Sequence, residues 1–186
     1  MYNTPYFYPY LYPYYINGQI YTYGSSPVYR TTANESRFYS SYSINSNGAD
    51  FFEDYGKKPL VFNINEATKL NNTYRTAIWT GPYLQATLMS IDVGDDIGLE
   101  LHPDVDQFIR VEQGEGLVQM GETKENLKFE RIVYDDYAIF IPAGKWHNLT
   151  NIGNTPLKLY SIYAPPNHAF GTVHVTKADA LAAEEG

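Results

Sequence analysis

The chain has 186 residues, of which 44% are hydrophobic, and a formal net charge of −8 at neutral pH. It contains no cysteine, which excludes disulfides, zinc–thiolate sites and cysteine nucleophiles. The negative charge argues against a nucleic-acid partner, and no apolar run approaches the length of a membrane span, so we expect neither partner. The length suits one domain with additional segments.

Residues 1–50 differ in composition from the remainder of the chain. Twelve of the 19 tyrosines fall within residues 1–42, and residues 1–16 alternate tyrosine with proline. Proline removes hydrogen-bond donors and fixes φ, so this stretch is expected to form an irregular, extended arm. Residues 17–50 are rich in Ser, Asn, Gly and Thr and are expected to form a linker, with turns at Asn17-Gly18 and Asn47-Gly48.

Tyrosine both stacks and hydrogen-bonds, so the arm can pack against its own domain or a second copy, or act as the adhesive tail of a surface layer. In composition the arm resembles the Tyr/Pro-rich stretches of bacterial spore coat proteins. We therefore expect a homodimer or a larger self-assembly through the arm. The N-terminus lacks the basic start and apolar run of a secretory signal, which predicts a location in the cytoplasm or in a spore coat or similar layer.

The compact domain is predicted to span residues 51–186. A short strand is expected at 58–62 and a short helix at 65–70, capped by Asn63 or Asn65. Further on, β-branched and aromatic runs separated by Gly/Pro turns predict strands at 74–80, 84–93, 97–102, 107–112, 117–120, 127–133, 138–141, 146–150 and 157–164. Such a series indicates an all-β sandwich or barrel. Thr176 and Asp179 have the spacing of a capping box and predict a helix over 177–184.

Four side chains in two short segments have the chemistry of metal ligands. Glu100 and His102 are two residues apart on a predicted strand, so their side chains face the same way. Gln107 follows after a turn, and His147 follows a Pro-Ala-Gly turn. Two imidazoles, one carboxylate and one amide oxygen suit a divalent Mn, Fe, Ni, Co or Zn ion. The alternative is a hydrogen-bonded polar cluster that holds no metal.

The spacing of these residues resembles the two sequence motifs of the cupin superfamily. The first motif spans residues 94–114 and reads Gly94, five residues, Glu100-Leu101-His102, four residues, Gln107, six residues, Gly114. The second spans residues 136–151 and reads Asp136, five residues, Pro142-Ala143-Gly144, two residues, His147, three residues, Asn151. Relative to the family pattern, Glu100 replaces the first His, Gln107 replaces the Glu, and Asp136 replaces the leading Gly. Because Glu100 brings the charge that Gln107 lacks, the ligand set keeps the net charge of the family's set.

The resemblance covers residues 71–166 and implies a single-cupin chain. The implied fold is all-β, a jelly-roll β-barrel with an irregular N-terminal arm and a short C-terminal helix. Residues 160–179 also resemble the tail of small bacterial cupins described as mannose-6-phosphate isomerase-like, which points to a sugar or sugar phosphate as the small molecule.

The function implied by the resemblance is a metal-binding cupin that acts on or binds a small molecule. An enzyme of this kind would be a metal-dependent isomerase, dioxygenase or lyase, with Glu100 as a possible base. The alternative function is a structural protein of a spore coat or surface layer, in which the barrel is a scaffold and the tyrosine-rich arm mediates association.

Other residues are candidates for the walls of the pocket. Arg75, Gln85 and Tyr163 lie on predicted strands and are candidate substrate-binding residues. His168 and His174 lie outside both motifs and are expected at the surface or at an interface. Strand alternation from Gln107 places two residues inside, Ile109 and Val111, and three outside, Phe108, Arg110 and Glu112.

Overall fold

The computed structural model describes residues 15–16, 19–20, 42–44 and 50–184. The chain divides into two units, residues 1–35 and residues 36–186. In the first unit, β1 (Tyr15–Ile16) and β2 (Gln19–Ile20) pair antiparallel on either side of residues 17–18. The irregular arm over 1–16 and the turns at 17–18 and 47–48 fall, apart from Tyr15 and Ile16, outside the described residues.

The second unit opens with a short hairpin in the region expected to be a linker. Strands β3 (Tyr42–Ile44) and β4 (Asp50–Phe52) pair antiparallel. The linker segment therefore contributes regular structure. No helix in the described part of the chain has both the length and the apolar character needed to cross a membrane.

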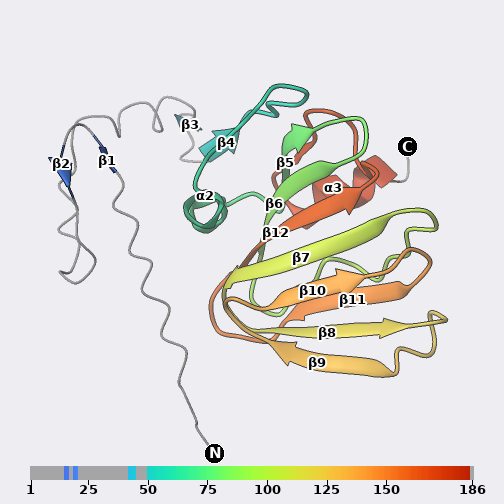
Figure 1. The fold of residues 1–186 in the computed structure, drawn as a ribbon. Coiled ribbons are helices and arrows are strands. Elements are labelled where there is room, and N and C mark those ends of the chain that lie inside the picture. The colour runs from blue at the N-terminus through green and yellow to red at the C-terminus, as the bar shows by residue number, and fades with distance from the viewer. Residues whose placement is uncertain (1–14, 17–18, 21–41, 45–49, 185–186) are drawn as a thin grey trace, which may run out of the picture. The chain divides into compact units, whose positions relative to one another are not determined.

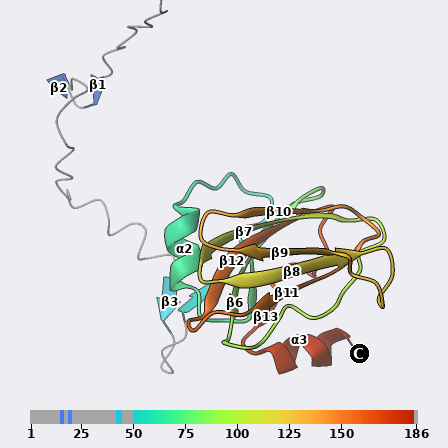
Figure 2. The same ribbon diagram turned by 90° about the horizontal axis from the view of Figure 1, so that it is seen from below.

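Two antiparallel sheets form the body of the second unit (Figure 1). The larger has the strand order β10-β7-β12-β6-β5-β13, with bounds β5 Arg75–Thr80, β6 Gln85–Ile91, β7 Asp106–Gln113, β10 Ala138–Ile141, β12 Leu157–Ala164 and β13 Val173–His174. The smaller has the order β11-β8-β9, with bounds β8 Gly116–Gly121, β9 Phe129–Val133 and β11 Trp146–Asn151. Figure 2 shows the two layers from below. This arrangement confirms the predicted all-β jelly roll.

The hydrophobic core fills the space between these sheets. Side chains from the larger sheet, such as Met89, Val111 and Leu159, form one buried cluster with Val118 and Leu149 of the smaller sheet. Ile109 and Val111 are both buried, as strand alternation predicted. Burial of these apolar side chains is the main source of the stability of the fold.

Two predicted strands are wrong. Residues 58–62 form no strand. The carbonyl of Lys58 instead accepts a hydrogen bond from the side chain of Trp79 on β5, Nε1, at 2.8 Å. Residues 97–102 make only an isolated bridge, between Glu100 and His147. The reason is local: Gly98 adopts φ +90°, and its amide donates to Asp96 Oδ1 at 2.9 Å rather than to a neighbouring strand.

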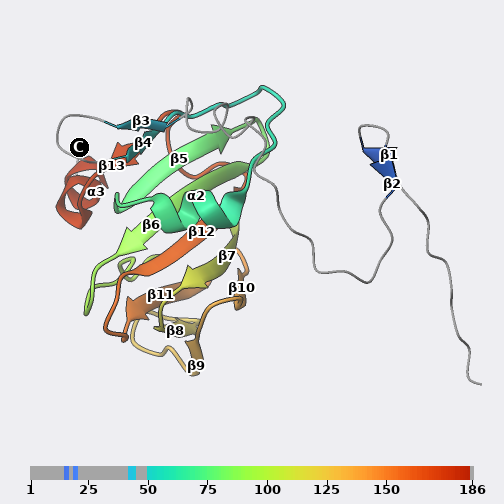
Figure 3. The ribbon, with the colours of Figure 1, turned by 90° about the vertical axis from the view of Figure 1, so that its left-hand side faces the viewer.

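Helix α2 (Ile64–Leu70) covers the outer face of the larger sheet (Figure 3). Of the two predicted caps, Asn63 is the residue that accepts from the Glu66 amide, at 3.2 Å. Asn65 instead donates to the carboxylate of Glu112. Glu112 lies on the outer face as predicted, but it is only 2% exposed because α2 covers it, and Arg110 pairs with it at 2.9 Å.

Helix α3 (Lys177–Glu184) begins at the predicted capping box. The Thr176 amide donates to Asp179 Oδ2 at 2.8 Å, and the Asp179 amide donates to Thr176 Oγ1 at 3.2 Å. Lys177 pairs with Asp95 at 2.6 Å and also with Asp96. The C-terminal helix is thereby attached to the loop that leads to Glu100.

Candidate metal centre

Glu100, His102 and His147 meet at one end of the barrel interior. Glu100 and His102 lie on the connection between β6 and β7, and His147 lies on β11. The Glu100 and His147 backbones exchange two hydrogen bonds, each of 3.0 Å, which places these residues directly opposite one another. The single bridge that survives in residues 97–102 therefore positions the two parts of the predicted site.

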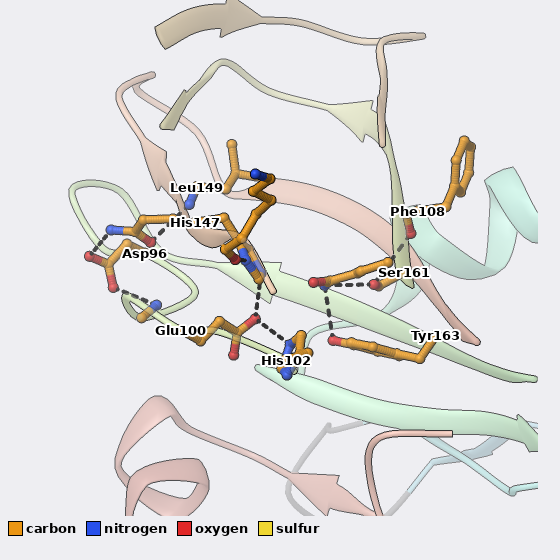
Figure 4. Close-up of polar contacts among 12 residues, drawn as sticks. Asp96, Glu100, His102, Phe108, His147, Leu149, Ser161 and Tyr163 are labelled. Atoms are coloured by element: carbon orange, nitrogen blue, oxygen red, sulfur yellow. Dashed lines mark hydrogen bonds and ion pairs between the residues drawn. The ribbon is translucent and has the colours of Figure 1, made fainter. Parts of the chain in front are cut away.

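The Glu100 carboxylate reaches toward both imidazoles (Figure 4). Its Oε1 atom lies 3.4 Å from His102 Nε2 and 3.3 Å from His147 Nε2. One potential ligand atom from each of the three residues lies within 4.8 Å of the other two. These separations are longer than the roughly 2.7–2.9 Å of a charge-assisted hydrogen bond. They are compatible with a group of ligand atoms arranged around a shared position.

The tautomer of His147 is set by a backbone carbonyl. Its Nδ1 lies 2.9 Å from the carbonyl oxygen of Lys145, which can only accept a hydrogen bond, so Nδ1 carries the proton. Nε2 is then the nitrogen on the Glu100 side, which can bind a metal ion or, when protonated, donate to the carboxylate. Metal-binding histidines are commonly oriented in this way by a backbone or carboxylate acceptor.

Gln107 is oriented so that its oxygen is available. Its Nε2 donates to Ser161 Oγ at 3.0 Å and to the Tyr163 hydroxyl at 3.2 Å. Its Oε1 is buried and has no hydrogen-bond partner among the described residues. The hydrogen bonds to β12 therefore settle which end of the amide is free to serve as a ligand.

The Glu100 carboxyl is strongly perturbed. Burial would raise its pKa, but the adjacent imidazoles of His102 and His147 outweigh burial and lower the pKa to about 2. The carboxyl group is therefore ionised at neutral pH and can serve as an anionic ligand. The side chain is 18% exposed, and that of His102 is 10% exposed, so the centre lies near the surface although its ligand atoms are buried.

The donor set fits a divalent transition metal. The four predicted ligand atoms are all buried without a hydrogen-bond partner among the described residues: Glu100 Oε1, His102 Nε2, Gln107 Oε1 and His147 Nε2. Buried polar atoms are nearly always satisfied, and leaving one unsatisfied costs on the order of 1–3 kcal/mol. An ion bound among these atoms would satisfy them together. Without an ion, a protonated imidazole 3.3–3.4 Å from Glu100 Oε1 would satisfy that oxygen alone.

The three predicted substrate-binding residues differ in what they contact. Tyr163 is 1% exposed, and its ring meets that of His102 edge to face at a centroid distance of 5.8 Å. Arg75 is also 1% exposed, and its charge acts on both Glu100 and Tyr163. Gln85 is fully buried, and its amide holds the backbone of residues 167–168 instead of facing a ligand.

His168 lies against the centre, contrary to the expectation of a surface or interface position. Its ring meets Tyr163 edge to face at 5.0 Å. Burial, followed by the positive charge of Arg75, lowers the pKa of His168 to about 3. No local pattern could have identified this residue, because it lies beyond both motifs and reaches the centre through contacts with β6 and β12.

The chain matches known proteins over most of its length. Residues 87–163 match the cupin domain family. The uncharacterized protein YrkC of Bacillus subtilis is 59% identical over 175 residues, which cover 92% of this chain and 94% of that protein. An uncharacterized protein of Acanthamoeba polyphaga mimivirus is 41% identical over 118 residues, covering 63% of this chain and 72% of that protein.

A solved structure shares both the sequence and the fold. The crystal structure of BH2720 from Bacillus halodurans is 64% identical and has a TM-score of 0.70, covering 70% of this chain and 98% of that protein. The family match falls on the strands that carry the candidate metal centre, and the described fold is a jelly roll. The chain therefore belongs to the cupin family.

Proposed function

We propose that this protein is a metal-dependent cupin that binds a divalent transition metal and uses it to act on a small molecule. The observation that carries the proposal is the set of four buried ligand atoms without hydrogen-bond partners, on the residues Glu100, His102, Gln107 and His147. Two imidazoles with carboxylate and amide oxygens suit Mn, Fe, Co, Ni or Zn. Glu100 supplies the anionic ligand of this set.

When bound, such an ion acts as a Lewis acid on a carbonyl or hydroxyl oxygen of a substrate. Residues of the chain hold the remainder of the site in place. The Lys145 carbonyl orients His147, and Ser161 and Tyr163 orient Gln107. We propose that the substrate approaches from the side of Glu100 and His102, whose side chains are partly exposed. The reaction classes that we propose are isomerisation, oxygenation or lyase chemistry on a sugar or sugar phosphate.

Elemental analysis of the purified protein tests this proposal. We expect about one equivalent of a transition metal per chain, because only one of the two candidate ligand groups among the described residues contains imidazoles. His102→Ala and His147→Ala should each lose the metal while the far-UV circular dichroism of the barrel remains. His168→Ala is the matched histidine control and should retain the metal. Unchanged metal content in both ligand variants would overturn the proposal.

Self-assembly through the N-terminal arm is a second proposal, and it rests on the concentration of tyrosine in residues 1–42. Removal of residues 1–35, the first unit, should leave the thermal transition within a few degrees and reduce the mass measured by light scattering. An unchanged mass would count against assembly through this arm. The outcome is independent of the metal proposal.

A further inference from the structure

Two more buried polar atoms lie beside the candidate metal centre. His168 Nε2 and Thr87 Oγ1 are shielded from solvent and have no hydrogen-bond partner among the described residues. Thr87 is opposite Ser161 in the strand register, two residues from the partner of Tyr163, and its hydroxyl lies near the Tyr163 hydroxyl. Neither atom belongs to the proposed ligand set. A ligand that carries a second polar group, besides the one at the metal centre, can satisfy them.

Tyr163 connects this pair of atoms to the metal centre. Its ring contacts His102 on one side, at 5.8 Å, and His168 on the other, at 5.0 Å. The Tyr163 hydroxyl accepts a hydrogen bond from Gln107 Nε2 at 3.2 Å, so its own proton is available for donation to a ligand. Tyr163 thus contacts two of the proposed metal ligands, His102 and Gln107, and also His168.

The position of His168 is determined by a dedicated contact. Gln85 Nε2 donates to the His168 carbonyl at 2.9 Å, and the His168 amide donates back to Gln85 Oε1 at 2.9 Å. Gln85 is fully buried in β6. The two hydrogen bonds from the Gln85 side chain fix the backbone of His168. They therefore position the His168 imidazole beside the barrel interior, where it can contact a ligand.

The electrostatic environment around these atoms favours a negative ligand group. Arg75 is buried on β5 opposite Met89, two residues from Thr87 along β6. Its positive charge is close enough to act on Tyr163, His168 and Glu100. A guanidinium recognises the two oxygens of a carboxylate in one plane, and neighbouring hydroxyl and imidazole groups complete such a site. A phosphate site of the common type would add a glycine-rich loop or a helix N-terminus, and the interior wall described here has neither.

We propose that Arg75, Thr87, Tyr163 and His168 form a subsite for the carboxylate of a small hydroxy acid, whose hydroxyl group lies toward the metal ligands. This inference rests on the proposed function, because it places the second oxygen of the substrate at the metal centre. It narrows the substrate of that proposal to a hydroxy acid, a class that includes sugar acids, with a carboxylate in place of the phosphate of a sugar phosphate. His168 and Thr87 determine specificity in this arrangement.

Isothermal titration of the full, manganese-loaded chain with lactate tests the subsite. Propane-1,2-diol is the matched probe, because it keeps the carbon skeleton and the hydroxyl group but lacks the carboxylate. We expect lactate to bind at least about tenfold more tightly than the diol, the effect of a hydrogen bond to a charged group. Equal affinity of the two probes, or inorganic phosphate binding tenfold more tightly than lactate, would overturn the carboxylate assignment.

Variants separate the subsite from the metal centre. His168→Ala and Thr87→Val should each weaken lactate binding about tenfold with metal content unchanged. Thr68→Val is the control, since Thr68 Oγ1 is also buried without a partner among the described residues but lies on α2. Lactate affinity that is unchanged in both test variants refutes the subsite. If the wild-type chain holds no metal, the proposed function is wrong. Lactate binding that still depends on His168 and Thr87 would support the carboxylate subsite even in that case.

Discussion

The interior of the barrel has an apolar end and a polar end, built from the same three strands. Along β12, the inward residues are Leu157 and Leu159 at the apolar end and Ser161 and Tyr163 at the polar end. On β6, the residues opposite the apolar end are Ile91 and Met89. Those opposite the polar end are Thr87 and Gln85. On β7, Val111 lies at the apolar end, opposite Leu159, and Gln107 lies at the polar end, opposite Tyr163.

The two ends contribute different properties. The apolar end is filled by mutually packed side chains from both sheets. At the polar end, the proposed ligand atoms and two further atoms lack hydrogen-bond partners among the described residues, which lowers stability unless a ligand satisfies them. Stability and chemistry are thus separated along the strand axis, and each end can be altered by itself to test this separation.

The largest effect on folding is expected at the apolar end. Leu159→Ala removes a fully buried side chain and should reduce the free energy of unfolding by about 2–5 kcal/mol, from lost burial and the cavity that remains. Metal content per folded chain should not change. Urea unfolding and elemental analysis provide the two measurements. Loss of metal from the folded Leu159→Ala protein would show that the two ends are coupled.

The next effect concerns the two departures from the family's ligand pattern. Glu100→Gln removes the anionic ligand, whereas Gln107→Ala removes a neutral oxygen. We expect Glu100→Gln to weaken manganese binding at least about tenfold more than Gln107→Ala, a difference of about 1.4 kcal/mol. Titration with a metal indicator measures both affinities. If Gln107→Ala loses metal while Glu100→Gln keeps it, Glu100 is not the ligand that holds the ion.

A smaller effect is expected in the pH dependence of stability. Burial, followed by the charge of Arg75, lowers the pKa of His168 from 6.5 to about 3, so the unfolded chain binds more protons than the folded chain between these values. Stability should therefore fall as the pH falls through this window. His168→Gln removes the titrating group. As the pH falls through this window, the free energy of unfolding of the wild type should therefore decrease by up to about 1.4 kcal/mol per pH unit more than that of the variant. Parallel pH slopes in urea unfolding would contradict burial of a neutral His168.

The smallest effect is expected for the hydrogen bond by which Ser161 orients Gln107, one of the proposed metal ligands. Ser161→Ala removes the hydroxyl that accepts from Gln107, and Gln107 then keeps only its bond to Tyr163. Stability should fall by about 1 kcal/mol, the net value of one hydrogen bond. Manganese affinity should fall less than in Gln107→Ala. A larger loss of affinity in Ser161→Ala would mean that the orientation of the amide matters more than the amide itself.

The sequence predicts elements that are governed by local patterns. Strands 138–141 and 157–164 and helix 177–184 match the structure residue for residue, because alternation and capping are encoded in neighbouring side chains. The spacing of the two motifs likewise predicts the approach of Glu100, His102 and His147, which the structure brings together. Residues 97–102 fail as a strand because a positive φ at Gly98 interrupts the ladder.

Features that depend on distant contacts were not predictable in this way. Glu112 is buried because α2 packs over it, and alternation within β7 says nothing of that helix. His168 reaches the polar end through Gln85, a partner 83 positions earlier in the chain. Gln85 itself was expected to face a ligand, and only the observed hydrogen bonds show that its amide is occupied.

The carboxylate of Asp96 joins three segments that are far apart in the chain. It accepts from the Gly98 amide at 2.9 Å, from Asn148 Nδ2 at 3.0 Å and from Lys177. Local opening of any one of these segments therefore breaks its hydrogen bond to the Asp96 carboxylate, to which the other two segments are also bound. Amide hydrogen exchange in the loop before Glu100 should consequently follow that of helix α3, so that the C-terminal residues govern how often the entrance to the metal centre loosens.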